Sequence, residues 1–73
     1  MVNVNLLKAA MAEAGYNQSR LSCAMEWAPN TTSAKVNGRS EITLSEARRL
    51  CEVLNIHSAE RKSEIFFAKN ISN

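Results

Sequence analysis

Apolar residues recur at intervals of three and four positions along most of this 73-residue chain. That spacing places them on one side of an α-helix, whereas a half-buried strand needs strict alternation. Gly, Pro and capping residues divide the pattern, and we expect helices at about 5–14, 17–25, 29–36, 44–54 and 59–64. With two glycines and one proline, the chain lacks the turn residues of an all-β fold. The pattern therefore predicts an all-α fold in one domain over residues 1–73.

The same spacing predicts which residues are buried. In the first and fourth helices we expect the core-facing residues to be Leu6, Leu7, Ala10, Met11, Ala14, Leu44, Ala47, Leu50, Cys51 and Leu54. Near the C-terminal end, Ile65 and Phe66 are assigned to the core. Thr43 and Glu46 have the spacing of a capping box, in which each side chain accepts the other's backbone N–H. The fourth helix should therefore begin immediately after Thr43.

Residues 17–38 are typical of two short helices joined by a tight turn. Asn17 can cap the first of them, in which Leu21 and Met25 form one apolar stripe. Arg20 and Ser22 of the same helix are expected to point toward solvent or a ligand. Pro29 is suited to the first position of the second helix, because its fixed backbone angle is already helical. Asn37-Gly38 then ends that helix, since both residues readily take the left-handed conformation.

The outer surface of the second helix is small and polar. Thr32 and Val36 are four positions apart and can face the core. The remaining residues present short or hydrogen-bonding side chains: Asn30, Thr31, Ser33 and Ala34. Such a face suits the major groove of DNA, where side chains must reach base edges. A solvated surface helix is the alternative interpretation that the residues leave open.

The charge distribution adds to this picture. The formal net charge is only +2, but residues 17–40 carry three basic side chains against one acidic side chain, Glu26. Residues 41–64 instead carry four basic and five acidic side chains. A local positive excess is what a phosphate-binding surface would show. Arg39, in the loop after the helix, is the cation that we expect to meet a phosphate, with a solvated arginine as the alternative.

The order and spacing of these residues resemble the Cro/repressor-type helix-turn-helix family, in particular its small prophage-type regulators. The resemblance rests on Asn17-Gln18, Leu21, Met25, Trp27, the Ser/Thr-rich run 30–36 and Asn37-Gly38, and it continues through 41–47 and 54–56. It implies a compact five-helix bundle of the lambda repressor-like type. It also implies a transcriptional regulator that binds an operator in double-stranded DNA.

Two residues depart from the family's pattern. Glu26 stands at the turn, where the family usually has glycine, so a strained backbone worth about 1 kcal/mol is expected there. Ala28 stands where a capping Ser or Thr is usual, and the loss of that cap costs roughly 1 kcal/mol. Both departures affect the angle at which the helix expected at 29–36 is held.

The resemblance and the chemistry of the groove together assign roles to individual residues. The residues expected to face the bases are Asn30, Thr31, Ser33 and Ala34. Those expected to bind phosphates are Gln18, Lys35, Asn37 and Arg39. Three adjacent bulky residues, Ile65 to Phe67, cannot all face one side of a helix. Phe67 is therefore assigned to the contact of a possible homodimer.

Two alternatives to DNA binding are a protein–protein interaction module and an enzyme. A protein–protein interaction module on the same small fold would use Trp27, Phe66 and Phe67 as exposed anchors. An enzyme is not expected, because no nucleophile–base set, paired carboxylates or phosphate-binding glycine loop is visible. We therefore expect neither a cofactor nor a small-molecule substrate.

The cysteines and the N-terminal region bear on location. Cys23 and Cys51 fall on apolar helix faces and are expected to be free, buried thiols in a reducing cytoplasm. Together with His57 they lack the spacing of a zinc site, so no metal is expected. No signal peptide and no segment as long as a membrane span are visible, so we expect a cytoplasmic location without a membrane partner.

Overall fold

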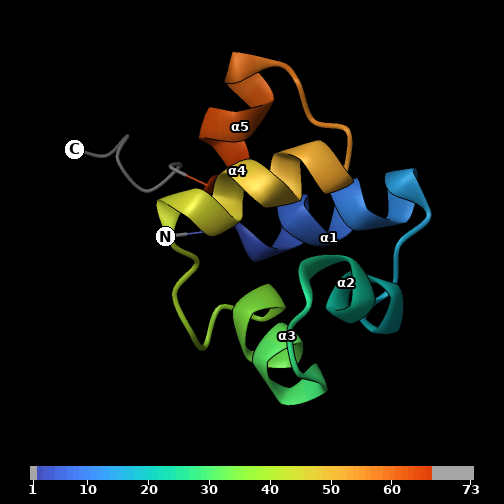
Figure 1. Cartoon of the computed structure of the whole chain (residues 1–73). Helices are drawn as coiled ribbons and strands as arrows, with labels where there is room; N and C mark the ends of the chain where they lie inside the picture. The colour runs from blue at the N-terminus through green and yellow to red at the C-terminus, as the bar shows by residue number, and fades with distance from the viewer. Residues whose placement is uncertain (1, 67–73) are drawn as a thin grey trace.

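Five helices form within residues 2–66, the part of the chain that this computed structural model describes (Figure 1). They are α1 (Val4–Ala14), α2 (Gln18–Met25), α3 (Pro29–Val36), α4 (Leu44–Val53) and α5 (Ala59–Phe66). No strand occurs in the described part of the chain. The all-α prediction is therefore confirmed. None of these helices, all within residues 2–66, is long and apolar enough to cross a membrane.

The first helix starts one residue earlier than predicted. Its N-cap is Asn3, whose Oδ1 atom accepts a hydrogen bond from the Leu6 N–H at 3.1 Å. Gly15 ends α1 in the left-handed conformation, as expected. The prediction that Leu6 is buried is wrong, since its side chain is 39% exposed. Leu6 lies in the first turn of α1, outside the buried face that Leu7 and Ala10 form.

The fourth helix begins with the predicted capping box. Thr43 Oγ1 accepts from the Glu46 N–H at 3.2 Å, and Glu46 Oε1 accepts from the Thr43 N–H at 3.0 Å. Ala47, Leu50 and Cys51 face the core. Leu44, predicted to do the same, is 58% exposed. It is the first residue of α4, where the helix projects beyond the elements that cover its later turns.

The last helix is longer than predicted. Ser58 Oγ accepts from the Arg61 N–H at 3.3 Å at its start, and the helix continues to Phe66 instead of ending near Glu64. Ile65 and Phe66 are both buried, as expected. Phe67 lies outside the described residues.

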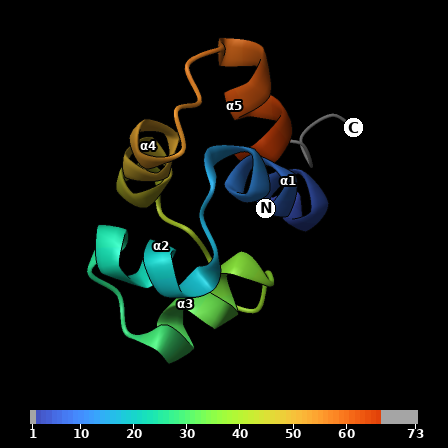
Figure 2. The same cartoon turned by 90° about the vertical axis from the view of Figure 1, so that its right-hand side faces the viewer.

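The helices pack in two groups around one core. Figures 1 and 2 show α1, α4 and α5 together, with α2 and α3 at the opposite end from α5. The Asn3 N–H donates to the Ile65 carbonyl at 2.6 Å, which joins the start of α1 to the end of α5. The buried apolar residues are Leu7, Ala10, Met11, Leu21, Met25, Val36, Ala47, Leu50, Cys51, Leu54, Ile56, Ile65 and Phe66. Each helix contributes to this core, which holds α3 at the surface.

Candidate functional site

The second helix is capped and buried as its sequence predicts. Asn17 Oδ1 accepts a hydrogen bond from the Arg20 N–H at 2.8 Å, which satisfies an otherwise unpaired helix N–H. Leu21 and Met25 face the core, and Leu21 has no exposed surface. Gln18, the first residue of α2, is exposed at the protein surface.

The turn between α2 and α3 places Glu26 in the left-handed region, with φ 59° and ψ 38°. The Glu26 N–H donates to the Cys23 carbonyl at 3.3 Å, and the Trp27 N–H donates to the Ser22 carbonyl at 3.0 Å. These bonds close the end of α2 in the manner of a Schellman motif. The turn predicted at this position is confirmed, and a residue with a Cβ atom occupies a conformation that glycine favours.

Replacing Glu26 with glycine should therefore raise the free energy of unfolding by about 1 kcal/mol, because it relieves the left-handed strain. Urea unfolding followed by circular dichroism measures the change. Glu52→Gly is the matched control: Glu52 is exposed in the last turn of α4, and glycine in a helix costs up to about 1 kcal/mol. If both substitutions raise the free energy of unfolding, or both lower it, this account of the turn is contradicted.

The third helix is anchored by one polar and one apolar residue. Thr32 and Val36 are buried, as predicted. The Ser22 hydroxyl donates to Thr32 Oγ1 at 2.7 Å, and Thr32 Oγ1 donates to the Ala28 carbonyl at 3.2 Å. Ser22 was expected to point toward solvent or a ligand, and this expectation is wrong. It belongs to the contact between α2 and α3.

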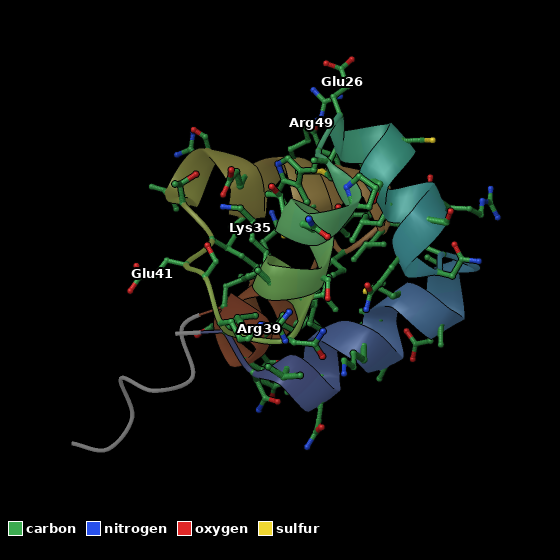
Figure 3. The ribbon with its side chains drawn as sticks, turned by 90° about the horizontal axis from the view of Figure 1, so that it is seen from below. Glu26, Lys35, Arg39, Glu41 and Arg49 are labelled. Atoms are coloured by element: carbon green, nitrogen blue, oxygen red, sulfur yellow. The ribbon has the colours of Figure 1, made fainter. Side chains whose placement is uncertain are left out.

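Figure 3, seen from below, shows that α3 forms the centre of one surface of the protein. Asn30 is exposed in its first turn, and its side chain forms no hydrogen bond with the described residues. The other three residues predicted to face bases are partly exposed: Thr31, Ser33 and Ala34. The structure thus places all four on the accessible side of α3.

The end of α3 brings three of the predicted residues together. Asn37 donates its side-chain amide to the Ser33 carbonyl at 2.9 Å, and Arg39 donates to Ser33 Oγ at 3.2 Å. Gly38, between them, has φ 80° and lies against Val4 of α1. Arg39 is exposed, so its guanidinium is accessible at the edge of the α3 surface (Figure 3).

Lys35, predicted to bind a phosphate, contacts other parts of the protein. Its Nζ atom donates to Glu46 Oε1 at 2.8 Å and to the Glu41 carbonyl at 2.9 Å. It also lies 5.4 Å from the centre of the Trp27 ring. The side chain is only 12% exposed, and Figure 3 shows it pointing sideways from α3. In the free protein, the ammonium predicted to bind a phosphate is therefore held by partners within the chain.

Two further arginines are placed by contacts that the sequence pattern did not reveal. Arg49, assigned to the outer side of α4, donates to the Ala24 carbonyl of α2 at 3.1 Å. Arg20, expected to point to solvent or a ligand, turns back to the Gly15 carbonyl at 2.7 Å and lies over the Tyr16 ring. The Arg49 contact joins residues of two helices and depends on how those helices pack, whereas the Arg20 contacts lie within five positions of it in the sequence.

The cysteines occupy different environments. Cys51 is buried, and burial raises the pKa of its thiol while the charge of Lys62 opposes that shift. Cys23 is exposed, so the prediction that both thiols are buried is wrong. Within residues 2–66, no three His, Cys, Asp or Glu side chains gather as a metal site would require.

No protein-family model matches the chain, and no curated protein or solved structure is significantly similar to it. The function is therefore inferred from the α2–turn–α3 unit itself. This unit presents a polar helix face, with an exposed amide at one end and an exposed guanidinium at the other.

Proposed function

We propose that the chain is a sequence-specific DNA-binding transcriptional regulator in which α2 and α3 form a helix-turn-helix. The observation that carries this proposal is the division of α3 into two faces. Thr32 and Val36 are fully buried, while the opposite side presents small polar residues at the protein surface. A helix of that kind can enter the major groove of double-stranded DNA without burying an apolar surface against the bases.

In this proposal, the exposed face of α3 reads the base edges. The Asn30 amide can pair bidentately with adenine, since it offers one donor and one acceptor in the required geometry. The Thr31 and Ala34 methyl groups can contact the methyl group of thymine. Ser33 accepts a hydrogen bond from Arg39 and retains a hydroxyl donor for a base edge.

The phosphate contacts of the proposal are Gln18 and Arg39. Both side chains are exposed, at the start of α2 and just beyond the end of α3. Contacts from these two places would fix the register of α3 without reading sequence. Lys35 and Asn37 bind within the protein, so we now assign them to holding the end of α3.

A fluorescence anisotropy titration with random-sequence duplex DNA at two salt concentrations tests the proposal. Phosphate contacts release counterions, so affinity should fall as salt rises. Selection of preferred duplexes from a random pool then tests for a sequence preference. Absence of salt-dependent binding, or selection without a consensus, would contradict the proposed function.

Arg39→Ala should weaken binding to every duplex alike, and it should flatten the slope of log K against log salt by about 1. The reason is the loss of one phosphate contact. Arg61→Ala is the control, since Arg61 pairs with Glu13 and lies in α5, which Figure 1 shows at the opposite end of the protein from α3. A changed base preference with an unchanged slope would show that Arg39 reads sequence instead.

A homodimer on a palindromic operator is part of this proposal. Two copies related by a two-fold axis would place their α3 helices about 34 Å apart, one turn of DNA. Phe67, the predicted dimer contact, lies outside the described residues, so its role stays a prediction. The proposal also implies that the chain acts in the cytoplasm of a bacterial host.

The alternative of a protein–protein interaction module is less well supported. Its expected anchors included Phe66, which is only 6% exposed and belongs to the core. Trp27 is partly buried, and Lys35 lies over its ring. Anchor residues in an interface are normally large, exposed side chains, and these two residues do not meet that description.

A further inference from the structure

The Lys35 side chain connects three segments that surround α3. Its Nζ atom contacts Glu46 in α4, the Glu41 carbonyl in the α3–α4 loop and the Trp27 ring in the turn before α3. Glu46 Oε1 accepts from both Lys35 and the Thr43 N–H. A single carboxylate oxygen therefore links the cap of α4 to the last turn of α3.

We infer that Lys35 and Glu46 form a positioning pair that fixes the orientation of α3 and thereby sets base preference in the proposed DNA complex. The inference rests on the proposed function. α3 packs on α2 and α1, with the Ser22–Thr32 hydrogen bond on the α2 side. The Lys35–Glu46 ion pair holds it on the α4 side, where the side chains are 12% and 26% exposed.

The geometry explains why such a pair is needed here. Ala28 provides no side-chain cap, and Glu26 takes a left-handed conformation that glycine would adopt more readily. The entry to α3 is thus less firmly defined than a capped helix start. Hydrogen bonds to base edges demand accurate placement of the side chains, which well-supported neighbours supply. The ion pair would provide this support at the opposite end of the helix.

The ionisation of Glu46 is consistent with this role. Burial alone raises the pKa of the Glu46 carboxyl, but hydrogen bonds from Lys35 and the Thr43 N–H outweigh burial and hold the pKa below its usual value. A lowered folded-state pKa contributes stability above the unfolded value, about 4.3 for glutamate, and this is lost as pH falls through the folded value. Above that pH range Glu46 is ionised, so its ion pair with Lys35 is fully formed.

Glu46→Gln and Lys35→Met separate positioning from direct phosphate binding. Both variants remove the ion pair: glutamine retains the capping box, and methionine retains most of the side-chain length but also loses the contacts with the Glu41 carbonyl and the Trp27 ring. Glu52→Gln is the control because Glu52 is exposed on the same helix and forms no ion pair among residues 2–66. Circular dichroism establishes that each variant is folded.

The direction in which Glu46→Gln changes DNA affinity distinguishes a positioning role from a simple charge effect. Removing an acidic charge from the protein should by itself tighten binding to all duplexes, and Glu52→Gln should have no effect beyond that. If Glu46 positions α3, Glu46→Gln and Lys35→Met should each lower the ratio of preferred to random affinity by about tenfold, equivalent to one good base contact. The salt slope should stay unchanged. The inference is overturned if Glu46→Gln behaves like Glu52→Gln, or if Lys35→Met flattens the slope with the ratio intact.

A second measurement on the free protein keeps this test independent of DNA binding. In two-dimensional NMR spectra, Glu46→Gln and Lys35→Met should shift the backbone amide signals of the same α3 residues, including Asn30 in its first turn. Glu52→Gln should leave those signals in place. If the wild type fails to bind DNA, the proposed function fails, while shifted α3 signals would still support the orienting pair. Unshifted α3 signals would overturn it.

Discussion

Leu21→Ala is expected to lower the free energy of unfolding by about 2–5 kcal/mol. Leu21 is fully buried in α2, so its truncation removes apolar contacts and leaves a cavity. Domains of this size are only marginally stable, with total stabilities of roughly 5–15 kcal/mol or less. Urea unfolding monitored by circular dichroism measures the loss. In the proposed function, DNA affinity should decline in step with the folded fraction.

Leu44→Ala provides the control for this change. The same substitution at a side chain that is 58% exposed should alter the free energy of unfolding by less than about 0.5 kcal/mol. Equal losses for the two variants would show that Leu44 is covered in solution, or that Leu21 is not part of the core.

Asn30→Ala is expected to weaken binding to the preferred DNA site by roughly 1–3 kcal/mol and to relax preference at one or two base positions. Non-specific affinity should barely change, because an uncharged amide releases no counterion. Asn30 is exposed in the first turn of α3 and makes no side-chain hydrogen bond with the described residues. Its truncation should therefore leave the fold intact.

Selection of DNA sites with the wild type and the variant, followed by titration of both consensus duplexes, measures this effect. Asn5→Ala is the matched control, since Asn5 is exposed on α1. If the wild type and Asn30→Ala return the same consensus, Asn30 does not read a base. Equal losses on random duplexes would instead indicate a general effect on affinity.

Several helix ends could be predicted from the sequence because they depend on local chemistry, although the start of α1 and the end of α5 were misplaced by one or two residues. Asn17, Pro29 and the Thr43–Glu46 capping box each act within one helical turn, and the structure confirms all three. Burial was harder to predict at helix ends. Periodicity identifies a face but does not show how far neighbouring helices extend along it, so Leu6 and Leu44 were wrongly assigned to the core.

The candidate site shows the same division between local and distant causes. The accessible face of α3 follows from the burial of Thr32 and Val36, and spacing alone predicts that. The engagement of Lys35 depends on Glu46, eleven positions away in the next helix. Ser22 likewise pairs with Thr32 across the turn. Sequence spacing identified these side chains as polar but carried no information about their partners.

The contact between Gly38 and Val4 limits which sequences this fold can tolerate. A Cβ atom at position 38 would lie 3.1 Å from the Val4 side chain, in addition to the strain of φ 80°. At Gly15, with a similar backbone, the nearest atom is the end of the Arg20 side chain at 4.0 Å. Asparagine, which tolerates the left-handed region, is thus an acceptable replacement at position 15. At position 38 it would in addition require the Val4 side chain to shift by a few tenths of an ångström, so sequence drift during evolution should spare this glycine unless position 4 becomes smaller at the same time.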